Sequence, residues 1–71
     1  MDTERFYKIR AHLSLAHQWT EDFEEHTYDL IEVESPIVPV RQANQAARLA
    51  LEVALKMLDD AREELVTDDW H

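Results

Sequence analysis

Hydrophobic side chains recur every three, four or seven residues through the first half of the chain. An α-helix has 3.6 residues per turn, so this spacing places them along one side of a helix. The pattern predicts a helix over about residues 3–34, although the β-branched and aromatic residues between 26 and 33 make its end the weakest part. The stripe consists of Phe6, Ile9, Leu13, Ala16, Trp19, Phe23, Leu30 and Val33.

A second stripe, rich in alanine, predicts another helix over about residues 39–66. Together with the flanking Val53, Leu55 and Met57, its members span nearly half of the helix circumference, which is wider than the contact with a single neighbouring helix requires. We therefore expect this helix to contact two partner helices. The stripe consists of Val40, Ala43, Ala47, Ala50, Leu51, Ala54, Leu58, Ala61 and Leu65.

The two prolines of the chain separate these helices. Pro36 and Pro39 stand close together, and each disfavours helix in the residue before it. We expect a linker over residues 35–39, an acidic tail over 67–71 and a single helical-hairpin domain over 1–71.

Charge placement favours an antiparallel arrangement. The chain has 71 residues, with 7 Lys and Arg against 16 Asp and Glu, and a formal net charge of −9. Seven acids lie between residues 21 and 34, and the next charges, Arg41 and Arg48, follow the linker; at the other end, acids from Asp59 onward would lie near Arg5 and Arg10. Opposite charges meet at both ends only if the helices run antiparallel, although an exposed pair contributes only about 0–1 kcal/mol.

A chain of this size has a marginal core, and with no cysteine it has no disulfide to reinforce it. The fold class we expect is all-α: an antiparallel two-helix hairpin that dimerises into a four-helix bundle. The residues that we expect in the core or the dimer interface are Phe6, Ile9, Leu13, Trp19, Phe23, Ala47, Ala54 and Leu58.

Composition disfavours several classes of partner and location. No apolar run of about 18 residues and no basic-then-apolar leader follows Met1, so we expect no membrane partner and a cytoplasmic location. Nucleic-acid binding rests on clustered Lys and Arg, and the opposite balance here predicts no direct nucleic-acid contact.

The motifs of catalysis and metal binding are weak. His17 and Glu21 lie one turn apart, but this spacing arises in any acidic helix, and the Glu-x-x-His pairs of di-iron bundles do not occur at His12, His17 or His26. No nucleophile with a base and no phosphate-binding loop can be assembled. We predict no catalytic residue, no metal and no cofactor.

The acidic surface is the strongest candidate for function. Carboxylates in rows on a rigid helix resemble the charges of phosphates and steer association with a basic protein, whereas a solvated face that keeps an oligomer soluble is the simpler interpretation. We predict a small, non-enzymatic inhibitor or regulator that docks on a larger basic protein, such as a nucleic-acid-binding protein, as a DNA mimic. The contact residues that we expect are Glu21, Glu24, Glu25, Tyr28, Asp29 and Glu32.

Two alternatives belong to other classes. One is a nucleotide-binding protein that holds an anionic ligand between protomers by Arg41, Arg48, His12 and His26. The other is a Mg²⁺-dependent all-α nucleotide pyrophosphohydrolase, with the acids of residues 21–25 supplying half of the site and Glu52 and Asp59 the other half.

Overall fold

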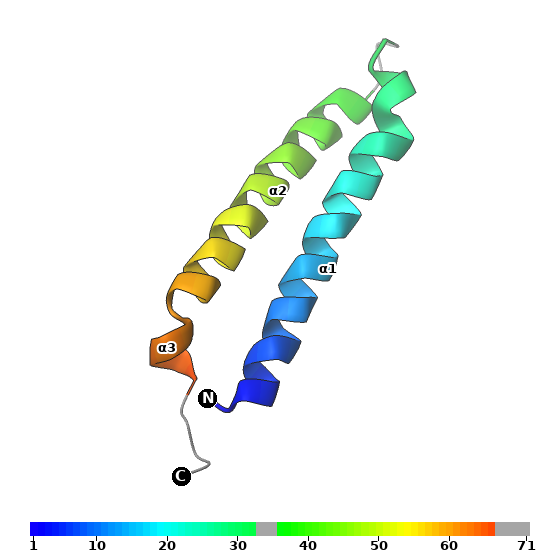
Figure 1. Cartoon of the computed structure of the whole chain (residues 1–71). Helices are drawn as coiled ribbons and strands as arrows, with labels where there is room; N and C mark the ends of the chain where they lie inside the picture. The colour runs from blue at the N-terminus through cyan, green and yellow to red at the C-terminus, as the bar shows by residue number, and fades with distance from the viewer. Residues whose placement is uncertain (33–35, 67–71) are drawn as a thin grey trace.

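The structure is a computed structural model and describes residues 1–32 and 36–66. It contains three α-helices, α1 (Thr3–Thr27), α2 (Ile37–Asp60) and α3 (Arg62–Leu65), and one 3-10 helix, η1 (Tyr28–Glu32); the described residues form no strand. Helices α1 and α2 lie side by side along their length, and α3 lies near the N-terminus (Figure 1). The predicted all-α hairpin is confirmed.

Local signals explain where α1 begins and where it changes. The carboxylate of Asp2 caps the first turn by accepting a hydrogen bond of 2.7 Å from the amide of Arg5. After Thr27 the chain tightens into η1, so the α-helix ends seven residues before the predicted boundary. The Thr27 hydroxyl donates to the carbonyl of Phe23 at 2.7 Å, and residues that bond to their own backbone in this way favour the ends of helices. Residues 33–35, which include the predicted end of this helix, lie outside the described residues.

Helix α2 begins at Ile37, two residues before the predicted start. Pro39 falls in its first turn, where a missing amide proton costs nothing because those amides have no partner within the helix. At the other end, α2 stops at Asp60, and Ala61 separates it from the single turn α3. The predicted helix over 39–66 is therefore divided near its end, and the predicted acidic tail, 67–71, lies outside the described residues.

Contacts between side chains far apart in sequence fix the direction of the two helices. Arg10 contacts Asp59, His17 contacts Glu52 and Glu24 contacts Arg48. As the residue number rises along α1, the number of the contacting residue on α2 falls, so α1 and α2 run antiparallel. The charge argument predicted this orientation, including the pairing of Arg10 with the second acidic block and of Arg48 with the first.

The hairpin alone buries little apolar surface. Among the described residues, Phe6 is the only hydrophobic side chain that is fully buried. Of the other side chains expected in the core or dimer interface, Trp19 and Ala47 are exposed, and those that are half-buried are Ile9, Leu13, Phe23, Ala54 and Leu58. None of the described helices has the length and hydropathy needed to cross a membrane.

Candidate functional site

A contact seam joins the two long helices, and its residues recur at intervals of seven. On α1 it consists of Phe6, Leu13, Thr20 and Thr27, and on α2 of Asn44, Leu51 and Leu58, with Leu65 of α3 continuing the series; all are buried or half-buried. The Asn44 amide donates to the carbonyl of Thr20 at 2.8 Å, which places these two seam residues in contact. Residues on either side of the seam therefore belong to two different faces of the hairpin.

The polar face of the hairpin is formed by the positions that come directly after the seam residues in the sequence. On α2 these are Glu52 and Asp59, one position after Leu51 and Leu58, and they contact His17 and Arg10 of α1. Arg10 Nε donates to Asp59 Oδ1 at 2.8 Å, and a second bond of 3.1 Å joins Nη2 to Oδ2. This hydrogen bonding lowers the pKa of Asp59 below its ordinary value of 3.8 and raises the pKa of Arg10.

His17 lies between two carboxylates on this face. Its Nδ1 is 3.2 Å from Glu21 Oε1. Its Nε2 is 3.4 Å from Glu52 Oε1, but this second contact does not have the geometry of a hydrogen bond. Both contacts become ion pairs when the imidazole is protonated. Glu21 and Glu52, which the hydrolase alternative places on opposite halves of a metal site, are thus brought to the same histidine.

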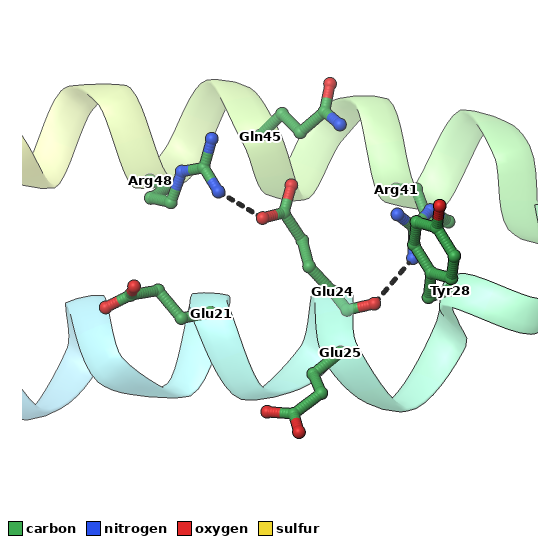
Figure 2. Close-up of a pocket in the computed structure, with 7 residues that line it drawn as sticks. All are labelled: Glu21, Glu24, Glu25, Tyr28, Arg41, Gln45 and Arg48. Atoms are coloured by element: carbon green, nitrogen blue, oxygen red, sulfur yellow. Dashed lines mark hydrogen bonds and ion pairs between the residues drawn. The ribbon is translucent and has the colours of Figure 1, made fainter.

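Two arginines of α2 converge on Glu24 of α1 (Figure 2). Arg48 pairs with the Glu24 carboxylate. Arg41, only 7% exposed, donates to the Glu24 backbone carbonyl at 2.8 Å and to the Thr27 hydroxyl at 2.5 Å. The carbonyl of Glu24 belongs to the last turn of α1, whose carbonyls lack partners within the α-helix and carry the negative end of the helix dipole. Arg41 therefore caps α1 and neutralises its end.

These arginines lie beside an open groove of about 680 Å³. Glu25 points away from α2 in Figure 2, whereas Glu24 lies between the helices. Tyr28 is 70% exposed. We use the name acidic edge for the exposed side chains at this end of the hairpin: Glu21, Glu25, Tyr28 and Asp29.

The acidic edge retains most of the predicted contact residues, but not Glu24. Glu24 is occupied by Arg48, and its side chain is only 17% exposed. No hydrogen bond or ion pair among the described residues involves the carboxylates of Glu25 and Asp29. The Glu32 side chain lies outside the part of the chain described at side-chain level, so the prediction for it stays open.

The apolar face lies on the opposite side of the seam. Because the residues after the seam on both helices contact one another, the residues before it must also lie together. On α1 these include His12, Trp19 and His26, one position before Leu13, Thr20 and Thr27. On α2 they form an alanine-rich surface in which seven side chains are exposed and Ala54 is half-buried: Val40, Ala43, Ala46, Ala47, Ala50, Val53, Ala54 and Met57.

The residues predicted to hold an anionic ligand do not converge within one hairpin. Arg41 and Arg48 lie at the groove and already engage Glu24. His12 and His26 lie on the apolar face, and His26 Nδ1 lies 2.7 Å from the carbonyl of Asp22. Within residues 1–32 and 36–66, no group of three or more His, Asp or Glu side chains is arranged to hold a metal ion.

Sequence reasoning missed the polar part of the seam. Thr20, Thr27 and Asn44 interrupt the hydrophobic pattern, and the structure joins them to the partner helix or to their own backbone. Their spacing of seven on α1 was the available signal, since Thr20 and Thr27 continue the series that begins with Phe6 and Leu13. Comparisons with protein-family models, curated protein sequences and solved structures gave no match.

Proposed function

We propose that this protein is a non-enzymatic protein-binding module, an inhibitor or regulator that docks through its acidic edge on a larger protein with a basic surface. The observation that carries the proposal is the exposed row of Glu21, Glu25 and Asp29 at steps of four residues. Glu21 and Glu25 are about one turn apart on α1, which separates them by about 6 Å along the axis on nearly the same side, and Asp29 follows in η1. Such a row presents repeated negative charge to a partner.

The row has properties expected of a docking surface. The Glu25 and Asp29 side chains are exposed, so they remain available to a partner. Tyr28 stands beside them with 70% of its surface exposed, and tyrosine is enriched among the residues that dominate binding energy at interfaces. A basic nucleic-acid-binding protein provides the matching charge, which would make the module a DNA mimic.

The proposal includes a homodimer in which two hairpins form a four-helix bundle. Its support is the small amount of apolar burial in one hairpin, where Phe6 alone among the described hydrophobic residues is fully buried. A dimer also doubles the number of acidic edges, and the net charge of −9 per chain strengthens long-range attraction to a basic partner.

Retention of basic proteins on the immobilised chain tests the docking proposal. The probe is the heparin-binding protein fraction of a cell lysate, because heparin selects proteins with basic nucleic-acid-binding surfaces. The double variant Glu25→Gln/Asp29→Asn neutralises the acidic edge, and Glu63→Gln/Glu64→Gln removes the same two charges from exposed positions on α3. We expect wild type and the α3 variant to retain a protein that salt and double-stranded DNA release, and the acidic-edge variant to lose it. Equal retention by both variants, or none by wild type, would contradict the proposal.

A further inference from the structure

We infer that the apolar face of the hairpin is the surface that binds a second copy of this chain, with Trp19 of each copy seated on the alanine-rich surface of α2 in the other. The inference rests on the homodimer included in the proposed function and specifies its interface. Trp19 is 65% exposed and Met57 is 65% exposed in one hairpin, and both lie on the same side of the seam. Large apolar side chains gathered on one exposed face mark an interaction site.

The composition of the face favours a neutral partner surface. The eight α2 residues of this face, from Val40 to Met57, are all apolar, so no charge interrupts it over five turns. Between residues 12 and 26, the titratable groups that α1 adds to this face are His12, Asp22 and His26. Two chains of net charge −9 repel one another, and this face brings them together through an α2 surface that has no carboxylate. A basic partner, in contrast, is attracted to the acidic edge.

The size of the face is that of a small dimer interface. The face extends on α2 from Val40 to Met57, a length of about 27 Å, and two helices side by side are about 20 Å wide. The face therefore offers about 540 Å² on each copy, compared with the roughly 800 Å² that each partner contributes to a standard protein interface.

The register of the hairpin makes the face complementary to itself. His17 contacts Glu52 and Arg10 contacts Asp59, so Trp19 lies about level with Ala50. A twofold axis parallel to the helices places α1 of one copy over α2 of the other while keeping each residue at its level. Trp19 of one copy then meets the small side chains Ala47, Ala50 and Ala54 of the other. A bulky ring opposite alanines gives the close packing that interface cores require.

This arrangement also completes the core of the hairpin. Phe23 and Ala16 of α1 and Ala54 of α2 are half-buried at the inner border of the face. A second hairpin laid on the face removes their remaining surface from water. The apolar stripe of α2 is then divided between α1 of its own chain and α1 of the partner, which explains why it is wider than one neighbour requires.

Sedimentation equilibrium of the full chain and four variants tests the interface. Trp19→Glu places a charge on the face, and Ala50→Leu enlarges the alanine surface with a residue of high helix propensity. Gln18→Glu introduces the same charge one position away, and Gln45→Glu places it on the polar side of α2; both sites are exposed. We expect wild type and both glutamine variants to be dimers. The dissociation constant should rise about 100-fold in Trp19→Glu and about tenfold in Ala50→Leu.

A double variant tests the pairing of Trp19 with the alanines. Trp19→Ala is measured alone and together with Ala50→Leu. The double variant lacks the ring that the leucine would meet, so it should dimerise more tightly than the product of the effects of Trp19→Ala and Ala50→Leu predicts. A dimer that neither Trp19→Glu nor Ala50→Leu weakens would overturn the interface and leave the homodimer standing. A wild-type monomer at every concentration would overturn both the interface and the homodimer, while the docking proposal is decided separately by the acidic-edge variants.

Discussion

Replacing Arg41 with methionine removes a buried cation that links α2 to the end of α1. Arg41 is 7% exposed and donates to the Glu24 carbonyl and to the Thr27 hydroxyl. Methionine preserves most of the apolar stem, so the variant chiefly deletes these two hydrogen bonds and the charge at the helix end.

The expected loss of stability follows from the two hydrogen bonds and the positive charge that Arg41→Met removes. A hydrogen bond from a charged donor contributes about 1.5–3 kcal/mol, and a cation at a helix C-terminus contributes about 0.3–1 kcal/mol. Removal of the burial cost of the guanidinium offsets part of this loss. We expect Arg41→Met to lower the free energy of unfolding by about 2–3 kcal/mol, a large fraction of the 5–15 kcal/mol typical of small proteins.

Urea unfolding followed by circular dichroism measures this change, at one fixed protein concentration because association adds to apparent stability. The matched control is Lys56→Met, which removes a cation that contacts Asp60 on an exposed surface of the same helix. Its effect should be about 0–0.5 kcal/mol. If Arg41→Met unfolds within 0.5 kcal/mol of the control, by the same magnitudes, the capping role of Arg41 is wrong.

Two further predictions concern the ion pairs between the helices. Arg10 lowers the pKa of Asp59 in the folded state, so ionised Asp59 stabilises the fold above its ordinary pKa of 3.8. This contribution is lost as pH falls through the lower pKa of the folded state. The difference in melting temperature between wild type and Asp59→Asn should therefore shrink as pH falls from about 5 to about 2, and a constant difference would contradict the prediction. Glu24→Gln should destabilise the hairpin more than Glu25→Gln in thermal melts, by about 1–2 kcal/mol, because Glu24 pairs with Arg48 and lies between the helices; equal melting temperatures would contradict this.

Much of the fold could be predicted because the signals were local or repeated. Pro36 and Pro39 marked the break, and the stripes marked both helices. The antiparallel direction followed from charge because the Arg10 and Arg48 partners lay in separate acidic blocks. The end of α1 at Thr27 was harder to predict, since the arginine that caps the carbonyl of Glu24, Arg41, comes from the other helix.

The candidate site was predicted only in part, for a similar reason. Glu24 and Glu25 are adjacent and identical in type, but Glu24 forms an internal ion pair with Arg48 of the other helix, whereas the Glu25 carboxylate is exposed. Likewise, helix periodicity grouped Trp19 with Phe6 and Leu13 on one stripe. The seam of the hairpin passes along one border of that stripe, which leaves Phe6 buried and Trp19 exposed.

The central claim, that each hairpin covers its apolar face with a second copy, is tested most directly by the exposure of Trp19. The chain contains two tryptophans, so the variant Trp70→Phe leaves Trp19 as the only one. Acrylamide quenching of its fluorescence can be followed while the protein is diluted from about 100 μM to about 10 nM, a range that spans common dissociation constants. The account predicts a shielded Trp19 at high concentration that becomes accessible on dilution as the dimer dissociates. Trp19 that is equally accessible throughout, at the level expected for a ring 65% exposed, would contradict it.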